Sequence, residues 1–291
     1  MDKQLKIVVL AKQVPDTRNV GKDAMKEDGT VNRAALPAIF NPEDMNALEQ
    51  ALRIKDAHPE AEVLLITMGP GRAADIIREG MFRGADGGVL VTDRKFAGAD
   101  TLATSYALSQ ALKQINPDII VAGRQAIDGD TAQVGPQVAE KLNMPQITYA
   151  EEIQEAGAEG VVVKRRLERG IEVVKSSLPV LITVTATAPA CRPRNAKQLM
   201  KFKYARTASE DQNENNVYHL SLEGHDYLKI AEWGLNEIGG EECNYGLSGS
   251  PTKVKKIENI VLQAKESKRI SGSDEDIEML VKELIATHTI G

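Results

Sequence analysis

The sequence contains few of the residues that build disulfide-linked, metal-binding or nucleic-acid-binding proteins. It has only two cysteines, Cys191 and Cys243, and neither lies at metal-ligand spacing from any of the four histidines. We interpret both as reduced thiols and expect no metal site. The formal net charge of -6 provides no excess of Lys and Arg for a phosphate backbone, so nucleic acid is not an expected partner.

Long apolar runs and catalytic motifs are also missing. No segment approaches the ~20 apolar residues that a membrane-spanning helix needs. The start, MDKQLKIVVLAKQV, has a short apolar run followed directly by charge, which predicts a first strand and not a signal peptide. We therefore expect no membrane insertion and a cytoplasmic protein. Glycine-rich phosphate loops and nucleophile motifs of known hydrolases and kinases are not found, so no catalytic residue is assigned.

Short apolar runs recur along the first half of the chain, in the order KIVVLA, EVLLITMG, GVLVT, DIIVAG and ITYAE. Runs that are apolar throughout are typical of strands covered on both faces, and segments with helical spacing lie between them. This alternation predicts a three-layer α/β/α fold with a mostly parallel, twisted, Rossmann-like sheet. Asn41-Pro42-Glu43 supplies an N-cap, a first-turn proline and an early acid for one of the helices.

The pattern changes in the second half. Residues 160–185 are charged and β-branched, which predicts a hairpin that turns at residues 168–170 and then a buried strand. Later proline, basic and polar residues indicate that the compact domain, residues 1–204, ends there and that residues 205–291 form an arm. The arm closes with an amphipathic helix that Ser273 or Asp274 can cap.

The segment VAGRQAIDGDTAQVGPQVA, residues 121–139, is the first candidate binding site. In parallel sheets, ligands lie beyond the carboxyl ends of strands, where helix N-termini point amides outward. Thr131 is expected to open a helix whose first amides hold a phosphate, with Arg124 neutralising its charge. Asp128 and Asp130 then accept hydrogen bonds from ribose hydroxyls or cap the helix. The alternative, that D-G-D-T is only a turn and an N-cap, is equally consistent with the residues.

Two further segments have alternative interpretations. In TDRKFAGADTLATS, residues 92–105, spacing alone favours Asp100 as an N-cap and Phe96 as a core contact. Alternatively, this segment is a ligand-facing loop adjacent to the first candidate in the sheet. The basic stretch CRPRNAKQLMKFK, residues 191–203, is either a solvated face or a loop whose Leu199-Met200 pair anchors a partner protein.

Several segments together resemble the β subunit of electron transfer flavoproteins, from about residue 5 to residue 203. They are LKIVVLAKQVPD, VNRAALPAIFNPEDMNALEQAL, TMGPGRAADIIREGMFRGAD, GRQAIDGDTAQVGPQ and VKRRLERGIEVVKSSLPVLITV. The resemblance implies a heterodimer with an α subunit and an adenine nucleotide bound in this chain. It assigns the nucleotide contacts to Leu10, Asn41, Pro42, Glu43, Asp44, Met68, Gly123, Arg124, Gln125, Ala126, Ile127, Asp128, Gly129, Asp130, Thr131, Ala132, Gln133 and Val134.

The resemblance leaves two types of family member open. In one type the nucleotide is a structural AMP, and the heterodimer carries electrons through a single flavin held mainly by the α subunit. In the other, FAD accepts hydride from NADH and bifurcates the electrons, to ferredoxin or flavodoxin and, through the α-subunit FAD, to an acyl-CoA dehydrogenase-like partner. Residues 92–105 and LSGSPTKV, residues 247–254, resemble the bifurcating type, which we favour. The flavin and nicotinamide side would be Phe96, Ala97, Gly98, Asp100 and Thr101.

The resemblance also implies two protein contacts. Residues 191–203 resemble the family's recognition loop for an acyl-CoA dehydrogenase, with Leu199 as the candidate anchor. The other candidates there are Arg194, Lys197, Met200 and Lys201. We further expect the terminal helix to pack on the α subunit. An alternative hypothesis, from a different functional class, is that the chain is a colourless, non-redox module that binds an adenine nucleotide. This hypothesis gives no function to the hairpin, the basic stretch or the terminal helix.

Overall fold

The computed structural model describes residues 4–16, 36–212, 222–252 and 269–287. The chain divides into two compact units, Met1–Lys255 and Lys256–Gly291. The change in composition after residue 204 predicts a boundary at that point, whereas the first compact unit continues through residue 255. The boundary expected from composition therefore differs from the one that packing produces.

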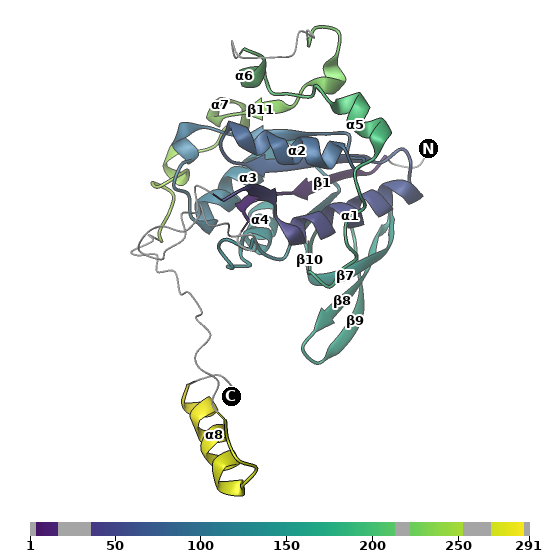
Figure 1. Cartoon of the computed structure of the whole chain (residues 1–291). Helices are drawn as coiled ribbons and strands as arrows, with labels where there is room; N and C mark the ends of the chain where they lie inside the picture. The colour runs from purple at the N-terminus through teal and green to yellow at the C-terminus, as the bar shows by residue number, and fades with distance from the viewer. Residues whose placement is uncertain (1–3, 17–35, 213–221, 253–268, 288–291) are drawn as a thin grey trace. The chain divides into compact units, whose positions relative to one another are not determined.

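A nine-stranded sheet forms the centre of the first unit (Figure 1). In spatial order its strands are β11 (Ala231–Trp233), β5 (Gly87–Val91), β4 (Glu62–Met68), β1 (Lys6–Leu10), β6 (Ile119–Gly123), β10 (Val180–Val184), β7 (Gln146–Gly157), β8 (Gly160–Leu167) and β9 (Gly170–Ser176). Neighbouring strands from β11 to β7 are parallel, and β7, β8 and β9 are antiparallel. Two short strands, β2 (Gln13–Pro15) and β3 (Ala38–Phe40), pair separately.

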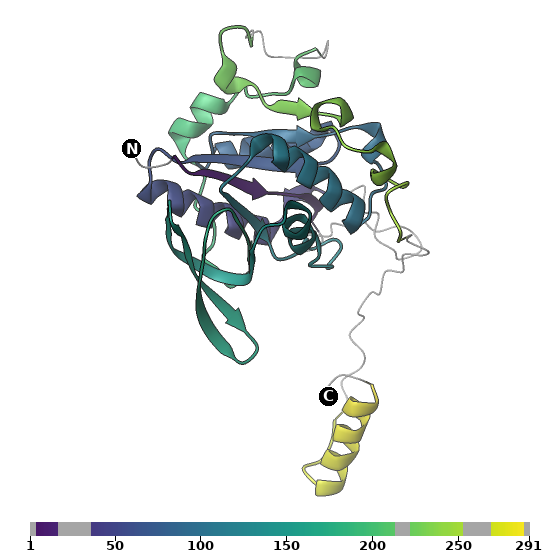
Figure 2. The ribbon, with the colours of Figure 1, turned by 180° about the vertical axis from the view of Figure 1, so that it is seen from behind.

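Helices cover both faces of this sheet, as the two opposite views show (Figures 1 and 2). They are α1 (Pro42–Ala57) and α2 (Ala74–Met81) on one face, and α3 (Thr101–Ile115) and α4 (Val134–Leu142) on the other. Because side chains alternate along a strand, Ile7 of β1 packs in the core beneath α1 and α2, while Val8 packs in the core beneath α3 and α4. The predicted three-layer α/β/α fold is confirmed.

The order of the strands creates a topological switch point. From β1 the chain moves outward through β4 to β5, and it then returns to place β6 on the opposite side of β1. Loops that leave the carboxyl ends of β1 and β6 diverge there, toward helices on opposite faces. In sheets of this kind the resulting crevice is where ligands bind. The fold therefore positions the loop after β6 beside the loop after β1.

The predicted hairpin is formed by β8 and β9, which turn between Leu167 and Gly170. Strand β9 is the outer strand at this end of the sheet, and among the described residues it pairs only with β8. Two of its apolar side chains face solvent: Ile171 is 50% exposed and Val173 is 58% exposed. An outer strand with such side chains is a surface on which other chains can pair.

The described residues 205–212 and 222–252 pack on the sheet and do not form a separate arm. It contributes Ala205, Leu228 and Ile230 to the core beneath α2, and Tyr245 to the opposite core. Its strand β11 extends the sheet beyond β5. It also contains α6 (Ala208–Asp211) and α7 (Leu235–Ile238). Composition predicts an arm because this segment is polar overall, but several of its apolar residues, Leu222, Leu228, Ile230, Ile238 and Tyr245, are buried.

The second unit contains α8 (Asp274–Ala286), the helix that the sequence predicts. Ser273 caps it, since its hydroxyl accepts a hydrogen bond from the backbone N–H of Asp276. Its apolar side chains are not covered within this unit; the most exposed are Ile277, Met279, Val281 and Ile285. No described helix, α8 included, is both long enough and apolar enough to cross a membrane.

We expect Ile230→Ala to destabilise the first unit by about 2–5 kcal/mol, because the side chain is buried in the core and its removal leaves a cavity. The only tryptophan, Trp233, lies in the adjacent strand β11, so urea unfolding followed by its fluorescence reports on this region. Ile277→Ala in α8 is the matched control and should leave the midpoint unchanged, since this isoleucine is 47% exposed. Equal midpoints for both variants would contradict the assignment of residues 205–252 to the first unit.

Candidate functional site

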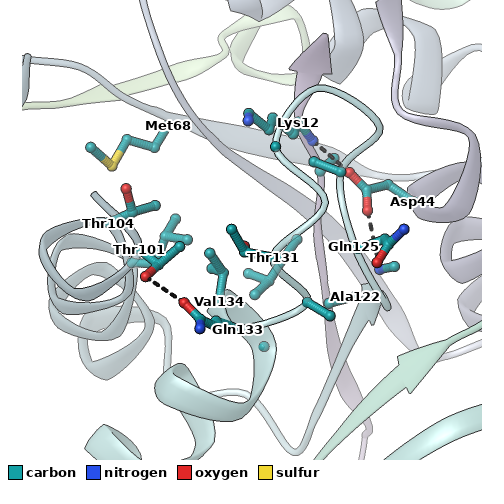
Figure 3. A pocket seen from close by; sticks show the side chains of 18 of the residues that line it. Lys12, Asp44, Met68, Thr101, Thr104, Ala122, Gln125, Thr131, Gln133 and Val134 are labelled. Atoms are coloured by element: carbon teal, nitrogen blue, oxygen red, sulfur yellow. Dashed lines mark hydrogen bonds between the residues drawn. The ribbon is translucent and has the colours of Figure 1, made fainter. Parts of the chain in front are cut away.

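A cavity of about 440 Å³ lies at the carboxyl ends of β1, β4 and β6, within the range typical of small-molecule sites (Figure 3). Its lining comes from these strand ends, from the start of α1, from the segment between β5 and α3, from the first half of α3, and from the loop that precedes α4. The lining residues are Leu10, Ala11, Lys12, Asp44, Ile66, Met68, Phe96, Gly98, Ala99, Asp100, Thr101, Thr104, Leu108, Ala122, Gly123, Arg124, Gln125, Ala126, Gly129, Asp130, Thr131, Ala132, Gln133, Val134 and Gly135.

The N-terminus of α1 holds the loop after β6 in place through three buried side chains. Asn41 donates its Nδ2 to the carbonyl of Gln125 at 2.9 Å and accepts from the N–H of Ile127 at 3.1 Å. Glu43 accepts from the N–H of Gln125 at 2.9 Å. Asn41 occupies the predicted N-cap position, but its side chain makes no capping hydrogen bond to α1. The N-cap prediction is therefore correct for the position of Asn41 and wrong for the partner of its side chain, because both the oxygen and the nitrogen of the amide bind the loop.

Asp44 joins the loop after β1 to the end of β6. One carboxylate oxygen accepts from the N–H of Lys12 at 2.8 Å and the other from the N–H of Gly123 at 3.1 Å (Figure 3). Only glycine fits at position 123, since a Cβ there would lie 2.3 Å from Asp44 Oδ1. We refer to Asn41, Glu43 and Asp44 together as the α1 clamp. It fixes the backbone from which half of the cavity is built.

Burial raises the pKa of Asp44 to about 7. Hydrogen bonds from the Asn41 side chain and from the two backbone N–H groups act in the opposite direction and offset only part of this effect. The neighbouring carboxylate of Glu43 adds to the rise. Asp44 is therefore a carboxyl group whose charge is sensitive to pH near neutrality.

The segment between the clamp and α4 is a loop and not the start of a helix. Helix α4 begins at Val134, so the prediction that Thr131 opens it is wrong. Asp130 and Ala132 adopt left-handed backbone conformations, with φ of 49° and 53°. These two residues turn the chain around one side of the cavity before the helix begins. Neither Asp128 nor Asp130 makes a capping bond to α4.

Both cationic side chains that line the cavity already have acidic partners. Lys12 Nζ lies 2.8 Å from both carboxylate oxygens of Asp128, and Arg124 lies 3.2 Å from Glu43. Asp130 accepts a hydrogen bond from Gln125 at 2.9 Å. The expectation that Arg124 alone neutralises the charge of a ligand is therefore incomplete, because Lys12 also lines the cavity. The sequence indicates no role for Lys12, because its link to Asp128 spans more than a hundred residues.

The opposite wall of the cavity comes from the loop after β5 and from α3. Asp100 caps α3, accepting from the N–H groups of Leu102 and Ala103, and Phe96 is buried. The simpler interpretation of both residues is therefore correct, yet both also line the cavity. The expectation that this loop is adjacent to the loop after β6 in the sheet is wrong, since β4 and β1 lie between β5 and β6. The two walls meet instead where Thr101 donates to Gln133 Oε1 at 3.0 Å.

Most of the residues that the sequence proposes for the nucleotide do line the cavity. The exceptions, which lie outside its lining, are Asn41, Pro42, Glu43, Ala97, Ile127 and Asp128. Of these, Asn41, Glu43 and Ile127 take part in the hydrogen bonds of the clamp. Asp128 forms an ion pair with Lys12. The lining residues that the sequence does not single out are Ala11, Lys12, Ile66, Ala99, Thr104, Leu108, Ala122 and Gly135. Alternation along β4 and helical spacing in α3 are the signals that predict Ile66, Thr104 and Leu108.

The basic stretch after Cys191 contains a short helix, α5 (Ala196–Phe202), where the sequence predicts a loop. Asn195 caps it by accepting from the N–H groups of Lys197 and Gln198. Arg194 pairs with Glu79 at 2.7 Å. Leu199, the candidate anchor, is partly buried, whereas Met200 is 68% exposed. Among the described residues no group of histidine, cysteine or acidic side chains could hold a metal ion.

We expect Asp44→Asn to change how stability depends on pH. Because the folded-state pKa, about 7, exceeds the ordinary value of 3.8, the folded state holds this proton more tightly. The contribution of Asp44 to the free energy of unfolding therefore falls as the pH rises from about 4 to about 7, and is constant above that. Urea unfolding of the ligand-free chain between pH 5 and 8 should show a steeper decline for the wild type than for Asp44→Asn. Asp274→Asn in α8 is the control, and parallel curves for Asp44→Asn and wild type would contradict the raised pKa.

The sequence matches a family model described as electron transfer flavoprotein domain over residues 28–207. The electron transfer flavoprotein subunit beta of Megasphaera elsdenii is 43% identical over 260 residues, covering 87% of each chain. The caffeyl-CoA reductase-Etf complex subunit CarD of Acetobacterium woodii is 49% identical over 251 residues, 86% of each chain. The acryloyl-CoA reductase electron transfer subunit gamma of Anaerotignum propionicum is 41% identical over 299 residues, covering 98% of this chain and 100% of that one. The chain therefore belongs to the β subunits of the electron transfer flavoprotein family.

Proposed function

We propose that this chain pairs with an α subunit and that its cavity binds FAD, through which the heterodimer takes hydride from NADH and bifurcates the electrons. One path leads to ferredoxin or flavodoxin, and the other leads through the α-subunit FAD to an acyl-CoA dehydrogenase-like enzyme. The observation that carries the proposal is that one cavity combines a loop rich in backbone donors with an apolar wall. These are the two surfaces that a flavin dinucleotide requires.

The loop before α4 suits the phosphates. Ala132 is left-handed and Gln133, with φ of -106° and ψ of -29°, is right-handed, a succession that points neighbouring N–H groups into one concavity. Within the described part of the chain, no acceptor is found for the backbone N–H groups of Thr131 or Ala132. The first N–H groups of α4 follow directly and have no partner inside the helix. An anion placed here would receive several hydrogen bonds without a dedicated cation.

The remainder of the cavity suits an aromatic ring system. Leu10, Ile66, Met68, Phe96 and Leu108 contribute apolar side chains from four different elements. A flavin carries the hydride and electron chemistry itself, so the chain needs only to bind it, orient it and exclude water. Consistent with this, the cavity contains no histidine or cysteine.

Contacts with other proteins follow from two exposed surfaces. We assign the acyl-CoA dehydrogenase-like partner to α5, where Lys197, Met200 and Lys201 are exposed. Met200 is better placed than Leu199 to enter a pocket on that partner, because Leu199 is partly buried. We assign the α subunit to the exposed apolar side chains of α8. The relative from Acetobacterium woodii is named for a caffeyl-CoA reductase-Etf complex and the one from Anaerotignum propionicum for an acryloyl-CoA reductase, which supports a partner of this class.

The alternative is a simple electron carrier with a structural AMP. The donor-rich loop alone is sufficient for such a nucleotide, and the clamp serves both cases equally. We favour FAD because the apolar wall continues well beyond that loop.

The heterodimer itself tests the choice. After purification of this chain with its α subunit, we expect a second FAD per heterodimer, no AMP, and rapid loss of visible flavin absorbance on addition of NADH under anaerobic conditions. A single FAD with AMP and no response to NADH would identify a simple electron carrier. A colourless protein that binds AMP or ATP by itself would instead identify a non-redox binding module.

Lys12 and Asp128 should have opposite effects on nucleotide binding. Lys12→Met removes a cation from the cavity and should weaken AMP binding to the nucleotide-free heterodimer about tenfold, with a smaller dependence on salt. Asp128→Asn releases Lys12 from its ion pair and should leave binding unchanged or make it tighter. Titration calorimetry measures both, and Lys113→Met on α3, outside the cavity lining, is the control. Weaker binding in Asp128→Asn would show that Asp128 contacts the ligand, as the sequence suggests.

A further inference from the structure

We call residues 124–133, between β6 and α4, the phosphate loop. The wall opposite this loop depends on residues far away in the sequence. This wall, defined as Phe96, Gly98, Ala99, Asp100 and Thr101, follows β5 and lines the cavity. Behind it lies the segment of residues 245–252, which we call the support segment. The wall and the support segment are far apart along the chain: Asp100 and Ser250, which are hydrogen-bonded to each other, are separated by 150 residues. None of the residues in the support segment lines the cavity.

Apolar packing and two glycines bring the support segment against the wall. The ring of Tyr245 lies 5.0 Å from that of Phe96 and also 5.0 Å from that of Tyr106 on α3. Gly246 has a φ of 54°, and a Cβ there would lie 2.2 Å from the carbonyl oxygen of Lys95. A Cβ on Gly98 would lie 2.7 Å from Leu247. At Gly246 the two backbones therefore approach too closely for any other residue, while Gly98, with a φ of 74°, faces the side chain of Leu247.

Hydrogen bonds to Asp100 complete the attachment. The hydroxyl of Ser250 accepts from the N–H of Asp100 at 2.9 Å and donates to the carbonyl of Gly246 at 2.6 Å. Thr252 donates both its N–H, at 3.1 Å, and its hydroxyl, at 2.6 Å, to Asp100 Oδ2. Because Oδ1 receives the two N–H groups that cap α3, each oxygen of this carboxylate already has two donors. Asp100 is thus occupied in holding the wall.

The position of Asp100 also sets the distance between the two walls. Its neighbour Thr101 reaches across to Gln133 in the phosphate loop, at 3.0 Å (Figure 3). A ligand that occupies only the phosphate loop depends on the α1 clamp for its geometry. A ligand that extends from that loop to Phe96 depends in addition on the support segment. Among the described residues, only Ser250 and Thr252 of this segment form hydrogen bonds with Asp100 from outside its own loop and helix.

We propose that Ser250 and Thr252 are positioning residues that make the cavity selective for a dinucleotide: acting through Asp100, they hold the wall where a flavin ring system can pack, and they have no part in binding a mononucleotide. The proposal rests on the proposed function, because it takes the ligand to extend from the phosphate loop to this wall. It adds residues outside the cavity as determinants of which nucleotide is retained.

The test compares FAD and AMP in the heterodimer of this chain with its α subunit. For the double variant Ser250→Ala, Thr252→Val, we expect the dissociation constant of the cavity FAD to rise about tenfold. The AMP dissociation constant of the nucleotide-free heterodimer should stay within about twofold. Thr252→Ser retains the hydroxyl and should bind FAD like the wild type. Ser248→Ala, an exposed neighbour in the same segment, is the matched control.

Hydrogen exchange provides a second measurement that does not depend on the ligand. In the nucleotide-free double variant, amides of residues 96–101 should exchange faster than in the wild type, while those of residues 123–127 should not change. Equal weakening of FAD and AMP would show a general loss of stability and overturn the proposal, as would unchanged FAD binding or unchanged exchange. A wild-type heterodimer that retains no FAD in this cavity would contradict the proposed function before any variant is compared.

Discussion

The site depends on the α1 clamp. A parallel sheet leaves the loops after β1 and β6 to diverge toward opposite faces, and without a tie each would have many conformations. Asn41, Glu43 and Asp44 provide that tie from a single helical turn, and all three are buried. Their acceptors and donors are directed at backbone groups, so the loop after β6 is held by its main chain. Among the described residues, the N–H groups of Thr131 and Ala132 in this loop have no acceptor, so they are available to a ligand.

The sheet and the location of the cavity are predictable from the sequence because they depend on local patterns. Runs such as KIVVLA and DIIVAG are apolar throughout, which is typical of strands buried on both faces, and helical segments separate them. The switch point then determines where a cavity forms. Asn41 shows the limit of this reasoning: its position before Pro42 predicts a cap, but its side chain serves a loop more than eighty residues later. Lys12 and Asp128 illustrate the same limit, since no local pattern pairs them.

The polar stretch after residue 204 shows how composition underestimates packing. A short strand such as β11 needs only three residues to extend a sheet, and Tyr245 needs only one aromatic neighbour on each side to bury its ring. Such sparse contacts do not alter the average polarity of a segment. One wall of the cavity is nevertheless built on them, so a part of the chain that composition assigns to an arm contributes to the shape of the site.

The uncovered apolar side chains of β9 and α8 have a consequence for how the chain is produced. Ile171 and Val173 lie on an outer strand, and α8 presents Ile277, Met279 and Ile285 to solvent. A polypeptide with two such surfaces tends to self-associate whenever it is in excess over the molecules that cover them. The solubility of the free chain should therefore fall as its concentration rises, because both surfaces favour contacts between copies of the chain.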